Sequence, residues 1–191
     1  MYGYLFLAIM AVFSWFLVNL AGFDESGPDS VLAKGPDFFS ANYTKWQMDE
    51  QGMLKNKLFA DKMVHYRDDG KTHFTNPQYT LFSDSNNNVK HQQTPPWVIT
   101  SDSGISSADG KDLLLNGKVS IERTGAVGIK PLKINTTDLK VKPEISYAET
   151  EDWAELISLP NTTTGTGMKL VFKQPIHIEL LANVKGKYET K

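Results

Sequence analysis

The 191-residue sequence contains no cysteine, and its charges nearly cancel, with 20 Lys and Arg against 22 Asp and Glu. Without cysteine the chain cannot form disulfides, thiolate zinc sites or a cysteine nucleophile. A balanced charge gives no electrostatic basis for binding nucleic acid. Aromatic residues make up 11% of the chain, which argues against a wholly disordered protein. These features favour a folded domain without thiol chemistry.

Charge is also missing from the first 23 residues, since the first charged side chain is Asp24. The apolar run from Tyr2 to Phe23 predicts a helix that crosses a bilayer, because about 20 residues span its ~30 Å hydrocarbon core. A cleaved signal peptide fits less well, because no basic residue precedes the run. Burial in a globular core also fits poorly, because the segment has no polar face. We therefore expect residues 1–23 to be an uncleaved transmembrane anchor.

The residues that follow divide into a linker and a β domain. Residues 24–36 (DESGPDSVLAKGP) are rich in Gly, Pro, Ser and Asp, which is typical of a tether. Residues 37–191 alternate apolar and polar side chains in short runs, most clearly at 113–121 and 176–188. Turn signals such as Asn76-Pro77 separate the runs. This pattern predicts an antiparallel sandwich, jelly roll or barrel without a globular helix.

A faint internal repeat runs through the predicted strands. Asp61, Asp102 and Asp138 recur after similar segments, and Asn76-Pro77 and Asn116-Gly117 lie about fifteen residues beyond the first two. We interpret the aspartates as repeated turn or strand-end residues rather than acid–base groups. The repeat suggests a stack of strand pairs with open first and last edges, which can recruit a partner strand.

The sequence presents no convergent set of catalytic or metal-binding residues. The four histidines, His65, His73, His91 and His177, lack paired spacing, and no serine lies in a GxSxG motif. Residues 84–88 (DSNNN) lack the Gly and the terminal Glu of a calcium-binding loop. We therefore expect no enzyme, no cofactor and no metal. Two classes remain: a binding or transfer module, and a structural scaffold that assembles a membrane complex through strand edges.

Several segments, taken in order, resemble a known family. They are an N-terminal apolar run, LFAD with Tyr66, Asn76-Pro77, Trp97 with TSD, LNGKV at 115–119, Gly167-Met168 and the closing VKGKY at 184–188. The set is similar to the LptC family of the lipopolysaccharide export machinery of Gram-negative bacteria, over about residues 1–189. No single motif is diagnostic, but their order is specific.

The resemblance implies a fold, a location and partners. The fold is a twisted antiparallel β jelly roll of the OstA-like kind, V-shaped in section, with an apolar groove for lipid A acyl chains. The location is the inner membrane, with a single pass, a cytoplasmic N-terminus and the domain 37–191 in the periplasm. Implied partners are lipopolysaccharide, the LptA bridge protein, the LptB, LptF and LptG ABC transporter and membrane lipid, without nucleic acid.

The same resemblance suggests site residues at alternate strand positions. The groove candidates are Phe74, Leu115, Val119, Ile134, Leu170, Phe172, Ile178, Leu180 and Tyr188, which alternatively only fill the core. The C-terminal strand is expected to be the edge that pairs with LptA, through Leu180, Ala182, Val184, Gly186 and Tyr188.

Overall fold

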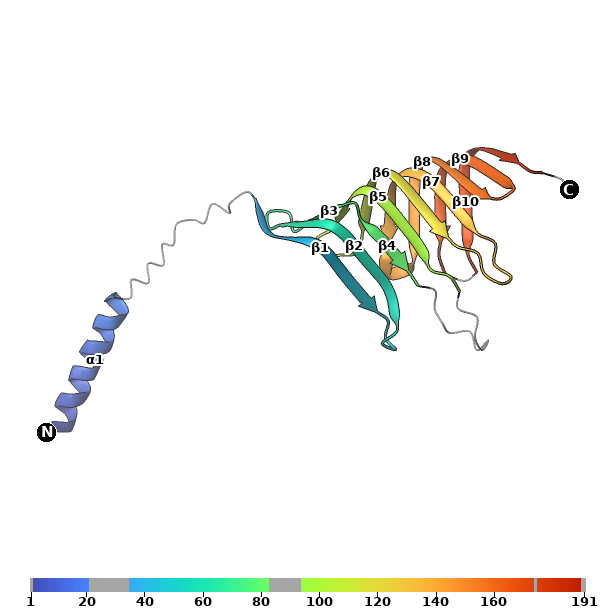
Figure 1. The fold of residues 1–191 in the computed structure, drawn as a ribbon. Helices are drawn as coiled ribbons and strands as arrows, with labels where there is room; N and C mark the ends of the chain where they lie inside the picture. Colours follow the sequence, from blue (N-terminus) through green and yellow to red (C-terminus); the bar gives the residue numbers. More distant parts are fainter. Residues whose placement is uncertain (1, 21–34, 83–93, 174, 190–191) are drawn as a thin grey trace. The chain divides into compact units, whose positions relative to one another are not determined.

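The computed structural model describes residues 2–20, 35–82, 94–173 and 175–189 (Figure 1). It forms two compact units, residues 1–34 and residues 35–191. Most of the predicted linker, the polar segment 84–88 and His91 lie outside the described residues.

The N-terminal unit contains one helix, α1 (Tyr2–Leu20), whose described side chains are exposed all around its axis. The prediction of a transmembrane helix over residues 1–23 is wrong for this structure. Among the described residues, no helix combines the length and the apolarity needed to cross a membrane.

The second unit is one antiparallel sheet, as the alternating pattern predicts. Its order is β1-β2-β3-β5-β6-β7-β8-β9-β10, so sequence neighbours are spatial neighbours and the ribbon colours run in order across it (Figure 1). The only other described element of this unit is the short 3-10 helix η1 (Pro143–Ile145). The strands are β1 (Pro36–Met48), β2 (Leu54–Tyr66), β3 (Thr72–Thr75), β4 (Gln78–Leu81), β5 (Trp97–Ser106), β6 (Leu113–Arg123), β7 (Leu132–Lys142), β8 (Tyr147–Ser158), β9 (Asn161–Val171) and β10 (His177–Lys187).

The Asn76-Pro77 pair differs from the predicted turn between separate strands. It interrupts one strand line, because β3 and β4 both pair with β2 on one side and with β5 on the other. Pro77 has no N–H to donate to a ladder, and Asn76 has a left-handed backbone with φ +48°. The backbone N–H of Asn76 instead donates to the carbonyl of Asp102 at 3.0 Å. The pair therefore marks a corner within the sheet.

Similar corners occur in the middle of the other strands. The pairs from β5–β6 to β9–β10 shift register there, which indicates β-bulges that bend the strands. Left-handed backbone occurs at or near these positions and at their counterpart in β1. The residues concerned are Asn42, Asn76, Gly117, Asp138, Gly167 and Asn183.

The recurring aspartates stabilise these corners rather than turns or strand ends. Asp61 accepts a hydrogen bond from the Asn76 side-chain amide at 2.8 Å. Asp102 accepts one from the Lys118 backbone N–H at 3.0 Å. Asp138 accepts one from the Gly117 backbone N–H at 2.9 Å. Each carboxylate joins neighbouring strand lines where bending leaves a backbone or amide donor without a ladder partner.

The bent sheet folds over onto its own apolar face. The rings of Trp97 at the start of β5 and Phe172 after β9 have centroids 5.4 Å apart. Along the sheet, β6, β7 and β8 separate them, a path of about 19 Å at the usual strand spacing. Lys55 of β2 likewise donates to the carbonyl of Glu144 beyond β7, at 3.2 Å. One sheet therefore supplies both walls of the core.

The corner at Gly117 gives the first prediction. Gly117 has φ +80°, and a Cβ there would meet the Asp102 carboxylate oxygen, so Gly117→Ala combines backbone strain with displacement of Asp102. We expect the free energy of unfolding of the full chain to fall by about 2–4 kcal/mol, measured by urea denaturation.

The matched control is Gly110→Ala, at φ +71° with no atom within 4 Å of the added Cβ. It carries the backbone strain alone, about 1–2 kcal/mol. Equal losses in the two variants would show that the contact with Asp102 does not stabilise the corner.

Candidate functional site

The folded-over sheet encloses a continuous apolar interior. Alternate residues of each strand point inward, and the side chains that they contribute from β2 through β9 form one buried cluster. Its largest fully buried members include Trp97, Ile99, Leu115 and Leu139. Tyr43, Leu132, Leu156, Ile178 and Leu180 pack against the cluster while staying partly exposed. The interior is therefore closed in its middle and reaches solvent at its margins.

The structure places eight of the nine groove candidates in or against this interior. Ile178 and Leu180 of β10 are half-buried against the core, whereas Tyr188 is 68% exposed. The other six are core residues with at most 5% of their surface exposed, namely Phe74, Leu115, Val119, Ile134, Leu170 and Phe172. Their places fit both a lipid path and ordinary core packing, so their role in binding lipid stays a prediction.

Strand β10 forms one end of the sheet, with no partner on its outer side among the described strands. Its pairing with β9 shifts by one residue between Ala182 and Lys185, where Asn183 has φ +53°. The predicted alternation is seen in burial from His177 to Leu180, where Ile178 and Leu180 are half-buried and His177 and Glu179 are exposed, and the described residues from Leu181 onward are all exposed. Of the proposed edge residues, Leu180 is half-buried and Ala182, Val184, Gly186 and Tyr188 are exposed. The Tyr188 hydroxyl lies 3.5 Å from the Thr163 hydroxyl.

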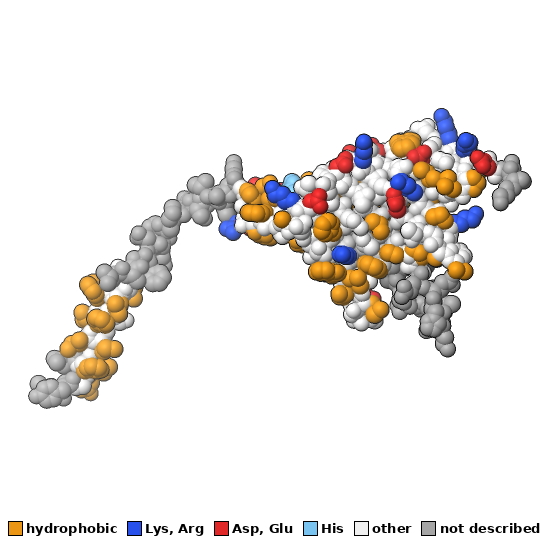
Figure 2. Space-filling view, in the orientation of Figure 1, with side chains coloured by type: hydrophobic (Ala, Val, Ile, Leu, Met, Phe, Trp, Pro, Cys, Tyr) orange, Lys and Arg blue, Asp and Glu red, His pale blue; other side chains and the backbone are white. Residues whose placement is uncertain are grey.

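Strand β1 forms the opposite end of the sheet and carries several exposed aromatic side chains. Phe38 stacks on His65 with centroids 4.6 Å apart, and Tyr43 contacts the core residue Phe74 at 5.8 Å. Phe39 and Trp46 are more than half exposed. In Figure 2, hydrophobic side chains gather over the β1–β2 hairpin. An open first edge was expected from the sequence, but no residue of β1 was named as part of a site, although the aromatic residues of this strand were a visible signal.

A cation lies over the interior at the ends of β5 and β6. The Arg123 guanidinium is 4.7 Å from the centre of the Trp97 ring, and burial lowers the pKa of Arg123. Burial also raises the pKa of the nearby core residue Tyr79. Four buried polar atoms in the described structure lack hydrogen-bond partners: the Tyr79 hydroxyl, Trp97 Nε1, Arg123 Nε and Asn161 Oδ1.

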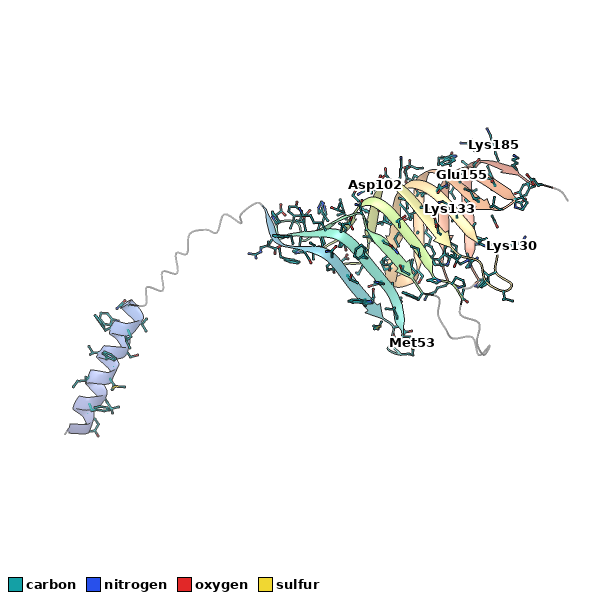
Figure 3. The ribbon with its side chains drawn as sticks, viewed as in Figure 1. Met53, Asp102, Lys130, Lys133, Glu155 and Lys185 are labelled. Atoms are coloured by element: carbon teal, nitrogen blue, oxygen red, sulfur yellow. The ribbon has the colours of Figure 1, made fainter. Side chains whose placement is uncertain are left out.

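Several charged groups outside the interior form ion pairs. Glu149 accepts from the Tyr147 hydroxyl at 2.9 Å and from Lys142 at 3.1 Å, which lowers the pKa of Glu149. Burial and the bond to Glu149 raise the pKa of Tyr147 to about 12. Figure 3 labels Lys133 and Asp102 among the side chains of the sheet.

Two surface hollows of about 500 and 570 Å³ lie beside the corners of the sheet, and both are lined largely by polar side chains.

The described histidines do not form a metal site. His65 Nδ1 lies 3.0 Å from the Thr72 hydroxyl, His73 contacts the Tyr66 ring edge-on, and His177 is exposed. Within the ranges that the structure describes, no group of three His, Asp or Glu side chains could hold a metal ion. The geometry favours binding of an apolar ligand or of a partner strand.

Comparison with known proteins supplies the family. No curated protein matches the chain. Among solved structures, it is similar to the crystal structure of LptH, described as the LptA homologous periplasmic component of the conserved lipopolysaccharide transport device from Pseudomonas aeruginosa. That similarity covers 82% of this chain and 96% of LptH, with 10% identity and a TM-score of 0.48. A similarity at this level does not by itself assign a function.

A family model described as "Lipopolysaccharide-assembly, LptC-related" matches residues 5–189, nearly the whole chain. The resemblance drawn from the ordered sequence segments is thereby confirmed. The chain belongs to the LptC-related family of lipopolysaccharide-assembly proteins, which gives it a non-enzymatic role in lipopolysaccharide transport with a domain that faces the periplasm.

Proposed function

We propose that the β domain carries lipopolysaccharide from the inner-membrane ABC extractor of LptB, LptF and LptG to the periplasmic bridge protein LptA. In this proposal the acyl chains move along the apolar interior, while the polar part of the lipid stays in solvent. The chain needs no nucleotide site of its own, because the extractor supplies the energy.

The continuous apolar interior is the observation that carries the proposal. Acyl chains in water need shielding, which is worth about 0.8 kcal/mol for each buried methylene. Core side chains fill the interior, so an acyl chain must displace some of them or enter along the margin. The half-buried Ile178 and Leu180 lie at that margin on β10, and Tyr43 lies at the margin on β1. These margins support entry at one end of the sheet and release at the other.

The two terminal strands supply the proposed partner edges. Each of β1 and β10 has a strand neighbour on one side only within the described sheet. An open edge presents backbone N–H and C=O groups that a strand of another protein can pair with. We assign β10 to LptA and β1 to the extractor, so that the sheet continues from protein to protein.

A scaffold that pairs with its partners without carrying lipid is the second candidate. The observation that favours it is the closed middle of the interior, where Leu115, Ile134 and Leu170 have no exposed surface. The two candidates share the edge contacts and differ only in whether lipid reaches the interior.

Crosslinking distinguishes these candidates. A photo-crosslinking amino acid at Ile178 should capture lipopolysaccharide during transport, because this side chain lies against the interior. Phe74 and Tyr188 should also capture it if the lipid passes from one end of the sheet to the other. The readout is the lipopolysaccharide-labelled band on an immunoblot.

Glu179 and Lys185, on the same strand as Ile178 but exposed, are the matched controls. They should give little or no labelled band. Labelling of equal strength at both sets of positions would overturn the interior path, and no labelling anywhere with intact partner binding would favour the scaffold.

Truncation tests the assignment of β10. Removing residues 184–191 deletes the C-terminal part of β10, which follows the bulge at Asn183. We expect binding to LptA to fall by at least about tenfold, because several edge hydrogen bonds and apolar contacts are lost together. Co-purification and surface plasmon resonance with LptA measure the effect.

A truncation that removes only residues 190 and 191 leaves β10 complete and should bind LptA like the intact chain. Thermal melting of both truncated chains reports whether the rest of the sheet stays folded. If the folded 184–191 truncation keeps full affinity, LptA pairs elsewhere on the domain.

A further inference from the structure

Arg123 occupies an unusual place in the sheet. It is the last residue of β6, directly opposite Trp97 of β5 and Leu132 of β7. Its guanidinium lies 4.7 Å from the centre of the Trp97 ring. Trp97 is a core residue with 1% of its surface exposed. A permanent positive charge therefore lies on the apolar face, at the end of the strands.

One buried N–H donor of each residue in this pair has no acceptor. Arg123 Nε and Trp97 Nε1 are both buried, and neither has a hydrogen-bond partner in the described structure. A buried N–H without an acceptor destabilises the fold, and more so when the group is charged. Arg123 also forms no ion pair with any described residue.

The nearest carboxylate in sequence does not neutralise Arg123. Glu122 belongs to the opposite face of β6, where it accepts hydrogen bonds from Lys133 at 2.7 Å and from Ser120 at 3.0 Å. These bonds lower the pKa of Glu122 and keep it ionised on the exposed side. The other two cations that lie over aromatic rings differ from Arg123. Lys57 covers the exposed Trp46, and Lys142 pairs with Glu149.

Apolar side chains lie beside Arg123 and Trp97. Leu132, opposite Arg123 on β7, is partly buried against the core, and the Phe172 ring packs edge-on against Trp97 at 5.4 Å. Burial lowers the pKa of Arg123, but an arginine stays charged at neutral pH. A cation with a free Nε–H, next to a free indole N–H and apolar side chains, is complementary to an amphiphile that carries an oxyanion.

We propose that Arg123 and Trp97 form a binding site for a phosphate group of the transported lipid, at the margin of the apolar interior. The guanidinium and the indole N–H donate to the phosphate oxygens, while Leu132 contacts the first methylenes of the attached chains. The site rests on the proposed function, since it assumes that lipid enters the interior. It would hold the lipid in one orientation while the acyl chains lie along the core.

Competition binding with the full chain tests the site. Three probes are tested for their ability to displace a fluorescent lipopolysaccharide from the protein. They are phosphorylated lipid A, the same lipid with its phosphates removed, and inorganic phosphate. Arg123→Gln should weaken binding of phosphorylated lipid A by at least about tenfold, because one charge-assisted contact is lost. The dephosphorylated lipid should bind Arg123→Gln and the unmodified chain equally. Inorganic phosphate should compete weakly, and only with the unmodified chain.

Lys57→Gln is the matched control, because it removes a half-buried cation over the exposed Trp46 ring. It should leave the affinity for every probe unchanged. Trp97→Phe keeps an aromatic ring but removes the N–H, and should give a smaller loss that is again confined to phosphorylated lipid. Melting curves confirm that each variant is folded.

The possible outcomes distinguish a failure of the phosphate site from a failure of the proposed function. If Arg123→Gln binds both lipids like the unmodified chain, Arg123 only packs on Trp97, and lipid transport through the interior still stands. An equal loss for both lipids would mean that Arg123 supports the fold, which also overturns the site. If the unmodified chain binds neither lipid, the proposed function fails as well. Strong binding of inorganic phosphate alone would point to a free-phosphate site instead of a lipid site.

Discussion

The structure depends on one constraint, namely that a single antiparallel sheet must bury its own apolar face. A flat sheet of this composition would leave its apolar face, which carries about half of its side chains, in contact with water. Here the strands bend near their middles, at bulges and left-handed residues such as Gly117 and Asn183, and the sheet covers itself. The contact between Trp97 and Phe172, across three intervening strands, is the direct result. Asp61, Asp102 and Asp138 accept the hydrogen bonds that the bent backbone and the Asn76 amide would otherwise lose.

This construction suits the transfer of an amphiphile. A sheet that folds over without closing into a barrel keeps two free edges, and β1 and β10 occupy them. The same alternation that fills the core supplies half-buried apolar side chains at the margins, among them Tyr43 and Leu180. Apolar shielding and strand pairing thus come from one element of structure. Membership of the LptC-related family gives this architecture its role in lipopolysaccharide transport.

Much of the fold could be predicted from the sequence, because alternation has a direct physical cause. The runs at 113–121 and 176–188 both fall in strands, β6 and β10. Bulges could not be predicted in the same way, because one extra residue shifts the pairing of a strand without a distinct signal in the alternating pattern. Asn183 is such a position, where the pairing of β10 with β9 shifts by one residue. The transmembrane prediction over residues 1–23 was wrong, since the described helix does not meet the requirements for a span.

The candidate site could likewise be predicted from the sequence only in part. Alternation correctly placed Leu115 and Ile134 on the inner face, but it could not tell a lipid-lining residue from a core residue, because both need the same side chains. Arg123 was missed, although it continues the series of Leu113, Leu115, Val119 and Ile121 at alternate positions. A charge in register with apolar residues was the available signal. Only the structure shows that this charge lies over Trp97 without an acceptor.

The central claim is that acyl chains enter the apolar interior, and methyl NMR tests it most directly. The full chain, labelled at isoleucine methyl groups, is mixed with lipopolysaccharide, and contacts between acyl methylenes and protein methyls are recorded as intermolecular nuclear Overhauser effects. Ile134 has no exposed surface and Ile178 lies at the margin, whereas Ile145 is 59% exposed on η1, outside the core cluster. The account predicts contacts to Ile178 and Ile134 and none to Ile145. Contacts to Ile145 alone, or to none of the three, would contradict it.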